Sequence, residues 1–372
     1  MKIVKVNATP IAIPIFRTHK IASYTLNAGY FVLVELATDD GLVGIGEAPL
    51  SMGPVFPEET WQGSVSLIQD YFAKILVGKD PFNVEEIMRE LDRSATRNFT
   101  TKCAVEFALY DLMGKVLNLP AYSLLGGSYR VNIPLSWSLA IGDPEKDAEE
   151  GARLVEKGHR IFKIKFGFLD PEMDITRLKA IRAAVGNDVD LRIDVNQGWT
   201  PDVAIRTIRR IEQLDLRPTF IEQPVPAWDV KGMALIAHAV ETPIMADEGL
   251  FTLSDALAII ELKAADIFAI KLMKHGGYLR SKQIAALAEA ADIPCYVGSN
   301  LETGVATLAC LHFVASTPMV TYGCELFGPK LLTDDVLSIP VEYSPGMVHC
   351  PSRPGIGASL DPQKVEKYRI RP

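Results

Sequence analysis

The sequence predicts an α/β protein in which a closed parallel barrel is preceded by a second unit of a different kind. Its 372 residues suffice for a barrel of about 250 residues and a further unit. From Asn132 onward, apolar runs of strand length alternate with helical stretches, as in repeated βα units. Nearer the N-terminus, Asp39-Asp40-Gly41 joins two strand-like runs, and strands joined by so short a turn are antiparallel.

Residues 1–125 are predicted to form the first, α+β unit. Its strands are expected at 3–15, at 30–37 and, after the turn, at 42–48. Leu119-Pro120 and the Gly126-Gly127 pair mark the exit from this unit. Helical patterns lie before that exit at 59–76, 84–93 and 101–118.

Residues 126–330 are predicted to form the barrel. Eight apolar runs are candidate strands: IPLSWSL, FKIKFG, LRIDVN, TFIEQP, IMADEG, IFAIKL, IPCYVGS and VTYGCEL. Helices between them are expected at 145–157, 171–185, 201–214, 229–240, 254–262 and 277–291. The segment 331–372 is rich in proline and glycine, and we expect it to return as irregular chain across the surface, toward the N-terminal unit.

Composition excludes several classes of protein. The formal net charge is −8, the pI is about 5.4 and no dense run of Lys or Arg occurs, so we expect no nucleic-acid partner. No apolar run approaches the roughly 20 residues that span a bilayer, and the N-terminus does not resemble a secretion signal. Five scattered cysteines without a CxxC spacing indicate neither a disulfide framework nor a zinc site. We therefore expect a cytoplasmic protein.

Charged residues stand at the ends of the apolar runs. From Lys165 onward, successive positions are separated by 29, 28, 25 and 24 residues, which is the spacing of βα units. The ends of all strands in a closed barrel meet on one face. The spacing therefore predicts one pocket that holds three carboxylates and three amines: Asp194, Glu222, Asp247, Lys163, Lys165 and Lys271.

Three converging carboxylates without His or Cys form a hard-oxygen site. Asp194, Glu222 and Asp247 would suit Mg²⁺ or Mn²⁺, with coordination positions left for water or substrate oxygens. Zinc would favour His or Cys ligands. Any one of these acids alone would be interpreted as a solvated loop charge or a helix cap, but three at matched strand ends favour a metal site.

The lysines predict proton chemistry. A lysine buried near a metal and other amines should have its pKa lowered from about 10.4 toward 7 or 8, where it can act as a general base or acid. Lys165 and Lys271 lie on strands four apart, so they should face each other across the pocket. Lys163 shares a strand face with Lys165 and is either an electrostatic helper or a salt-bridged barrel lysine.

Two neighbours of the acids are candidates for supporting roles. Asn196, two residues after Asp194, could hydrogen-bond a metal ligand or a metal-bound water. Glu248, next to Asp247, could orient Lys271 or the metal ligands, and an exposed loop acid is the alternative.

Five motifs together resemble the muconate lactonizing subgroup of the enolase superfamily. They are Lys163-Ile164-Lys165, DVNQGW at 194–199, IEQP at 221–224, ADE at 246–248 and KLMKHGG at 271–277, and the resemblance runs from GIGEA at 44–48 into the tail. It implies a (β/α)₇β barrel under an α+β capping domain that the C-terminal segment completes. It also implies Asp194, Glu222 and Asp247 as metal ligands and Lys165 and Lys271 as the acid/base pair.

Three further stretches resemble the muconate cycloisomerases of that subgroup: RTHKIASYT at 17–25, RNFTTKCAVEFALYD at 97–111 and CELFGPKLL at 324–332. They imply that cis,cis-muconate, or a substituted muconate, is closed to a lactone through an enolate that Lys165 protonates. The implied partner is thus a small carboxylate, and subgroup members are commonly homo-oligomers, so we expect one here. Candidates for contacting the substrate are Glu325 at the pocket rim and Arg17, His19, Lys20 and Tyr24 above it.

Other functions stay open at this point. The loop at 48–60 and LETG at 301–304 resemble the racemases of the subgroup. An N-acylamino acid racemase or dipeptide epimerase with the same lysines is therefore the alternative, although the Asp-bearing motif of dipeptide epimerases is absent near Glu325. A Schiff-base aldolase could use Lys271 but would not need three carboxylates. A non-catalytic scaffold would be expected to have lost an acid or a lysine, and all of them are present.

Overall fold

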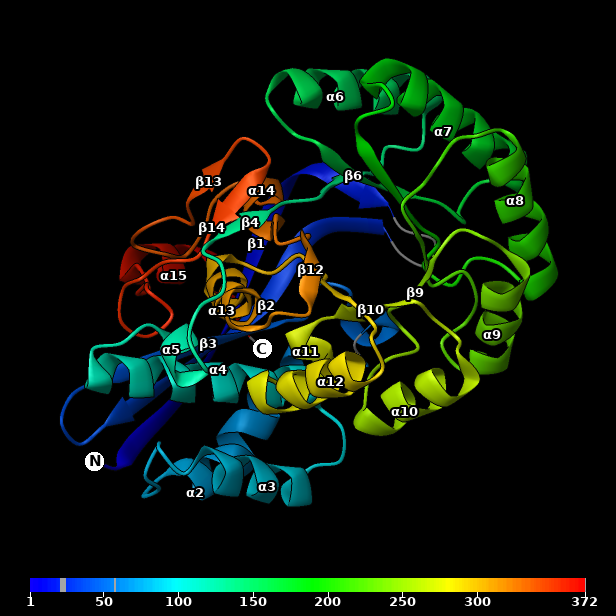
Figure 1. Ribbon diagram of the computed structural model, residues 1–372. Coiled ribbons are helices and arrows are strands. Elements are labelled where there is room, and N and C mark those ends of the chain that lie inside the picture. The colour runs from blue at the N-terminus through cyan, green and yellow to red at the C-terminus, as the bar shows by residue number, and fades with distance from the viewer. Residues whose placement is uncertain (21–24, 57, 372) are drawn as a thin grey trace.

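Eight parallel strands form a curled sheet in the computed structural model, which describes residues 1–20, 25–56 and 58–371, without the side chains of 17–20 and 25. A parallel bridge between Leu135 and Cys324 links the chain just before the first strand to the last strand, so the sheet closes into a barrel (Figure 1). The strands lie in sequence order: β5 Trp137–Leu139, β6 Ile161–Lys165, β7 Asp190–Asp194, β8 Ile221–Glu222, β9 Ile244–Ala246, β10 Ile267–Ile270, β11 Cys295–Val297 and β12 Val320–Cys324.

Helices connect the barrel strands, and Figure 1 shows α6 to α10 in an arc around the outside. Asp143 and Asp170 begin two of them as N-caps followed by proline, which suits the first helical turn. The order of elements is that of a (β/α)₇β barrel, so the predicted fold class is confirmed. The helices are α6 Pro144–Glu156, α7 Pro171–Val185, α8 Pro201–Gln213, α9 Val230–Ala239, α10 Leu253–Leu262, α11 Leu272–His275, α12 Tyr278–Ala290 and α13 Gly304–Ser316.

The N-terminal unit is an antiparallel sheet with helices against it. Its longest helix, α4, lies on β3 because Gly44 and Gly46 have no side chains. A Cβ at these positions would lie 2.1 Å and 1.9 Å from the carbonyl oxygens of Ala108 and Ala104, which explains the GIGEA motif. The elements are β1 Ile3–Lys20, β2 Thr25–Thr38, β3 Val43–Pro49, η1 Gly53–Val55, α1 Trp61–Ser66, the π-helical η2 Leu67–Phe72, α2 Ala73–Leu76, α3 Val84–Ser94, α4 Phe99–Leu117 and α5 Ala121–Leu124.

Two buried glutamates of the N-terminal unit bind the first turns of barrel helices, and we call Glu47 and Glu106 the seam acids. Glu47, on β3, accepts hydrogen bonds from the backbone N–H groups of Thr303 and Ala306 at 2.8 and 2.9 Å, where α13 begins. Glu106, on α4, accepts one from Leu279 at 3.0 Å, where α12 begins. A carboxylate at a helix N-terminus satisfies N–H groups that have no partner within the helix. The seam acids therefore join the two units.

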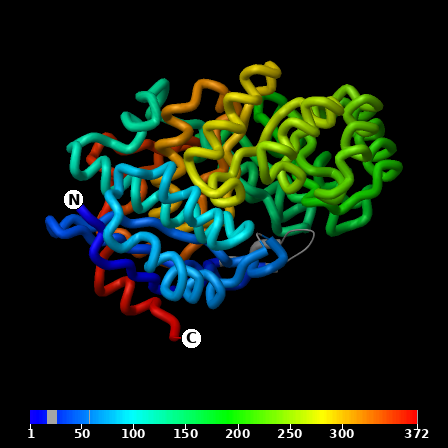
Figure 2. Tube along the Cα trace, turned by 90° about the horizontal axis from the view of Figure 1, so that it is seen from below, coloured from blue at the N-terminus to red at the C-terminus, as the bar shows by residue number. Residues whose placement is uncertain are grey.

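The segment beyond residue 330 is more regular than predicted. A short hairpin pairs with β4, and Asp361 caps a final helix that begins with Pro362, so the expectation of irregular chain is wrong for these parts. The segment then reaches β1, where the N–H of Ile370 donates to the carbonyl of Pro10 at 3.0 Å (Figure 2). The elements are β4 Asn132–Pro134, α14 Gly328–Leu331, β13 Tyr343–Ser344, β14 Met347–His349 and α15 Pro362–Tyr368. Across the described ranges, every helix is too short or too polar to cross a membrane.

Candidate active site

Three buried acids end adjacent barrel strands. Asp194 is the last residue of β7, Glu222 is the last residue of β8, and Asp247 follows β9 directly. Asp194 pairs in register with Glu222 on one side and with Lys165 on the other. None of the three acids is more than 1% exposed. The parallel register therefore places the predicted acids side by side at one mouth of the barrel, with Lys165 next to them.

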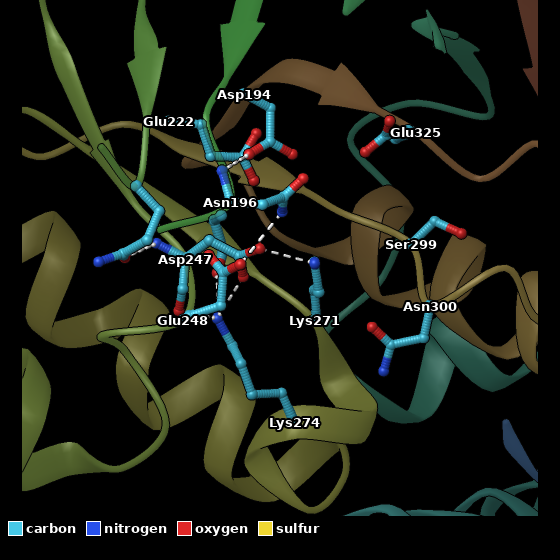
Figure 3. A network of polar contacts seen from close by, with 12 residues as sticks. Asp194, Asn196, Glu222, Asp247, Glu248, Lys271, Lys274, Ser299, Asn300 and Glu325 are labelled. Carbon is cyan, nitrogen blue, oxygen red and sulfur yellow. Dashed lines mark hydrogen bonds and ion pairs between the residues drawn. The ribbon is translucent and has the colours of Figure 1, made fainter. Parts of the chain in front are cut away.

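Each acid lies against a lysine. The Nζ atom of Lys165 donates to Asp194 Oδ2 at 2.6 Å, and Lys271 Nζ lies 2.6 Å from Asp247 Oδ2. Lys163 Nζ lies 2.7 Å from Glu222 Oε2. All three predicted amines thus share one polar network with the three predicted acids, part of which is drawn in Figure 3.

A fourth lysine was missed by the sequence argument. Lys274 is fully buried, and its Nζ donates to Asp247 Oδ1 at 2.8 Å and to the carbonyls of Asp247 and Ala269 at 2.5 and 3.1 Å (Figure 3). It lies three residues after Lys271, on the short helix α11, so one helical turn brings both amines to the same acid. The two lysines are visible in KLMKHGG, three residues apart. This spacing indicates that both contact one acid only if the segment is assumed to be helical.

Glu325 lies inside the network rather than at its rim. It follows β12, is 5% exposed, and its Oε2 lies 2.5 Å from Lys163 Nζ. Lys163 is therefore held between Glu222 and Glu325, and its Nζ also lies 4.8 Å from the ring centre of Tyr296. This arrangement makes Lys163 an ion-paired lysine of the barrel interior.

Asn196 and Glu248 connect to the acids. The backbone N–H of Asn196 donates to Asp194 Oδ1 at 3.0 Å, and its side-chain Nδ2 donates to Glu248 Oε1 at 3.1 Å (Figure 3). Burial, with Asp247 and Asp194 nearby, raises the pKa of Glu248 to about 7. Both residues are buried, so the alternative of an exposed loop acid for Glu248 is excluded.

The lysine pKa values differ from the prediction. Burial acts to lower the pKa of Lys165, but the carboxylates of Asp194 and Glu325 outweigh it, so the pKa is raised above its usual value. For Lys271, Asp247, Glu222 and Glu248 outweigh burial in the same way. In this arrangement each amine lies against an acid rather than against other amines, which raises its pKa. The lowering expected beside a bound metal stays a prediction.

Oxygen atoms at the mouth fit a divalent cation, although the acids are not gathered around a common point. Within the described residues, no three His, Cys, Asp or Glu side chains are close enough to share one ion. However, Glu222 Oε1, Glu248 Oε2 and Asn196 Oδ1 are buried and have no hydrogen-bond partner in the part of the chain that the structure describes. Glu222 Oε2 meets Lys163 as an ion pair without hydrogen-bond geometry. Unpaired buried oxygen atoms are costly, and such hard oxygen donors suit Mg²⁺ or Mn²⁺.

The side chain of Lys271 is enclosed by two loops. Phe56, from the N-terminal unit, places its ring centre 5.1 Å from Lys271 Nζ. Gly298, after β11, leaves room for the lysine stem, since a Cβ there would lie 2.6 Å from Lys271 Cε. The remaining substrate candidates are not placed: Tyr24 lies outside the described residues, as do the side chains of Arg17, His19 and Lys20 at the end of β1.

The order of the strands sets what the site can do. Lys165 stands on β6 and Lys271 follows β10, while the strands between them, β7 to β9, end in the three acids. Two amines therefore flank a group of carboxylates. Such an arrangement suits the transfer of a proton to or from either face of a carbon whose negative charge must be stabilised.

Known proteins resemble this chain over nearly its whole length. The N-terminal domain of mandelate racemase and muconate lactonizing enzymes matches residues 3–126, and the enolase C-terminal domain-like family matches residues 146–364. A chloromuconate cycloisomerase of Cupriavidus necator is 36% identical over 99% of both chains, and the L-Ala-D/L-Glu epimerase of Bacillus subtilis is 36% identical over 96% of both. The crystal structure of the muconate lactonizing enzyme of Pseudomonas fluorescens with muconolactone gives a TM-score of 0.96, at 36% identity over 99% of both chains. Relatives that are equally identical to this chain thus include a cycloisomerase and an epimerase.

Proposed function

This chain belongs to the family of mandelate racemase and muconate lactonizing enzymes and is a muconate cycloisomerase-like enzyme, and on that premise we propose that it closes cis,cis-muconate, or a substituted muconate, to a muconolactone. The observation that carries the proposal is the pair of amines, Lys165 and Lys271, on either side of three strands that end in acids. A ring closure through an enolate needs such a proton donor beside a site that stabilises negative charge.

Asp194, Glu222 and Asp247 would hold a divalent cation, Mg²⁺ or Mn²⁺. All three are oxygen donors on adjacent strands, and they would exchange ammonium contacts for contacts to the ion. When bound, the ion supplies positive charge that stabilises an enolate.

Ring closure and protonation involve only muconate and the two lysines. An oxygen of one carboxylate adds to the double bond conjugated with the other carboxylate, which closes the ring and moves an electron pair into an enolate. The ammonium of Lys165 then gives its proton to the enolate carbon, and the amine regains a proton from water. Lys271 stays an ammonium near the enolate, and the two lysines exchange roles if addition takes place on the opposite face.

The ultraviolet absorbance of muconate tests this proposal. With Mn²⁺ we expect the absorbance of muconate or a chloromuconate to fall as the conjugated diene is consumed, and EDTA should stop the loss. Product analysis by NMR should identify the lactone. If neither diene is consumed by the Mn²⁺-loaded protein, the proposed reaction is wrong.

A proton exchange α to a carboxylate is the second candidate function. It is favoured by the epimerase that is as similar in sequence as the cycloisomerase, and by the two flanking amines, one of which would remove a proton while the other returns it. Incubation of N-acylamino acids or dipeptides with the protein and Mn²⁺ in D₂O should then incorporate α-deuterium, which NMR detects. If α-deuterium appears fast while muconate is lost slowly, this second function is the correct one.

A further inference from the structure

A helix on the outside of the barrel binds the backbone of Lys165. Arg177, on α7, donates from Nη1 to the carbonyl oxygen of Lys165 at 2.8 Å. The next N–H along the chain, that of Phe166, donates to the carbonyl of Asp194 at 2.7 Å. The peptide group that ends β6 is therefore held at both of its polar atoms, by Arg177 and by the strand that carries Asp194.

Two acids fix the orientation of this arginine, and we call Arg177, Asp147 and Asp174 the anchor cluster. Asp147, on α6, accepts from Arg177 Nε and Nη2 at 3.1 and 2.8 Å. Asp174, three residues earlier on α7, accepts from Arg177 Nη1 at 3.0 Å. All three side chains are 0% exposed. A guanidinium held at each of its nitrogens by buried partners has one orientation, so its contact with Lys165 keeps one geometry.

The anchor cluster also holds the loops that follow β5 and β6. Asp147 accepts from two backbone N–H groups of the loop after β5, both at 3.1 Å. Asp174 accepts from the backbone N–H of Gly167 at 3.0 Å. A Cβ on Gly167 would lie 2.6 Å from the carbonyl oxygen of Val195, so this loop packs on the chain that follows β7. The cluster thus connects the ends of three adjacent strands at the mouth.

Among the barrel helices α6 to α10 and α12, buried charge is confined to α6 and α7. Every buried residue of α8, α9, α10 and α12, all of which lie within the described ranges, is uncharged. Uncharged packing therefore suffices to hold a helix on this barrel, and a buried ion pair is weak evidence for a role in stability. Because α6 and α7 precede and follow β6 in the chain, the exception coincides with the strand of Lys165 (Figure 1).

We propose that Arg177 is a positioning residue that fixes the end of β6, so that the amine of Lys165 stays beside the acids of the mouth. Arg177 is fully buried and contacts a backbone carbonyl and two acids, so it acts through Lys165 and not on the substrate. A displacement of about 1 Å can cost about 10²-fold in rate, because proton transfer needs a donor within hydrogen-bond reach. The inference rests on the proposed function in one respect, since it takes Lys165 as the proton donor.

A second arginine of α7 allows a matched test. Arg182 also donates to backbone carbonyls, but these precede β7 and β8, at the opposite end of the barrel. Arg177→Lys keeps a charge that can pair with an acid but loses the fork that also reaches the carbonyl of Lys165. Its kcat for muconate should fall about 10- to 100-fold with KM changed less than about threefold, whereas Arg182→Lys should keep kcat within about twofold.

A variant within the anchor cluster controls for stability. Asp147→Asn places an amide donor against N–H groups, which should lower Tm by several degrees, but it leaves Arg177 in contact with Lys165. Its kcat should stay within about threefold of that of the unmodified protein. A kcat that falls in step with Tm across the three variants would mean that the cluster only supports the fold. An unchanged kcat in Arg177→Lys would also overturn the proposal.

Amide hydrogen exchange provides a readout that needs no turnover. In Arg177→Lys the N–H groups of Phe166 and Gly167 should exchange at least about tenfold faster than in the unmodified protein, and in Arg182→Lys they should not. Equal exchange in all proteins would mean that Arg177 does not hold the end of β6. Failure of the proposed reaction is a separate result: the unmodified protein then leaves muconate unconsumed, while the difference in exchange is still measured.

Discussion

The buried acids at the barrel mouth and the seam acids differ in the partners they face. At the mouth, Asp194 and Asp247 lie against the ammonium groups of lysine side chains, and Asp194 also accepts from the backbone N–H of Asn196. At the seam, Glu47 and Glu106 accept from backbone N–H groups that are fixed in helices. An ammonium group can move away and let a cation take its place, whereas a backbone N–H cannot. The comparison teaches that the mobility of the partner separates an acid available for chemistry from one that holds the fold.

The two regions also differ in electrostatics. Burial raises the pKa of Glu47 and of Glu106 to about 8, and their hydrogen bonds offset this only in part. At Asp247 burial acts in the same direction, but Lys271 and Lys274 outweigh it and hold the pKa below its usual range. Full positive charges therefore keep Asp247 ionised, which the N–H dipoles do not do for the seam acids. At Glu222, burial and the nearby Asp194 raise the pKa despite Lys163.

The largest expected effect is on turnover at the mouth. Lys165→Arg keeps the positive charge beside Asp194 but removes a group that can give up a proton, since the guanidinium stays protonated. Muconate consumption should fall about 10²- to 10⁴-fold, with Tm changed by only a few degrees. The control Lys146→Arg, on the exposed face of α6, should leave the rate unchanged, and a Lys165→Arg variant that keeps near-normal turnover would contradict the assigned proton donor.

The second effect is a pH dependence of stability at the seam. Glu47 ionises near 4.5 in the unfolded chain and near 8 when folded, so between these values the folded chain holds one more proton. The free energy of unfolding should therefore fall as pH rises, by about 1.4 kcal/mol per pH unit for this group. The stability that protonated Glu47 contributes is fully present below about pH 4.5 and is lost as pH rises through 8.

Urea unfolding at pH 5, 6.5 and 8 checks this slope. Glu47→Gln keeps an acceptor for the first turn of α13 but cannot ionise, so its free energy of unfolding should fall less steeply than that of the unmodified protein. Glu342→Gln, at an exposed position, is the control. Equal slopes for all three proteins would show that Glu47 does not hold its proton in the folded state.

The third effect is the stabilisation by Mn²⁺, which should depend on the acids of the mouth and not on the seam acids. Mn²⁺ at about 100 times its dissociation constant should stabilise the unmodified protein by about 2.7 kcal/mol. Glu47→Gln should keep this gain in full because the seam acid does not contact the mouth, and Asp247→Asn should lose most of it. Thermal unfolding with and without Mn²⁺ measures the gain, and an undiminished gain in Asp247→Asn would remove this acid from the metal site.

The smallest effect concerns the contact between the N-terminal unit and the mouth. The ring of Phe56 lies over the Lys271 ammonium, an interaction worth about 0.5–2 kcal/mol. Phe56→Leu should lower kcat/KM by about two- to tenfold. Tyr71→Leu removes a similar but exposed contact, with Lys74, and should have no effect on turnover. A wild-type kcat/KM in Phe56→Leu would mean that the ring plays no part in positioning Lys271.

The sequence predicts the barrel well because alternation of strands and helices is a local pattern. It does not indicate α13, since Gly304–Ser316 is buried on all sides and shows no amphipathic period. The predicted acids and amines of the mouth do lie in one network, because each ends an apolar run and the barrel brings strand ends together.

The sequence does not predict in the same way which side chain or backbone group each charged residue contacts. Lys274 reaches Asp247 only through the turn of α11, and the seam acids bind N–H groups that are far away in sequence. The direction of a lysine pKa shift depends on which charge lies nearest to each amine, and the sequence does not show that Asp194 and Asp247 are those charges.

The hydrogen bond between Ile370 and Pro10 joins the segment that follows the barrel to β1, the first strand of the N-terminal unit. Ile370 is synthesised after every strand and helix of the barrel, so the first strand of the N-terminal unit receives this neighbour only once the barrel residues have been made. The barrel can complete its own helices and strands before that moment. A nascent chain halted shortly before Ile370 would thus carry a folded barrel, while β1 of the N-terminal unit would still lack its hydrogen bond to Ile370.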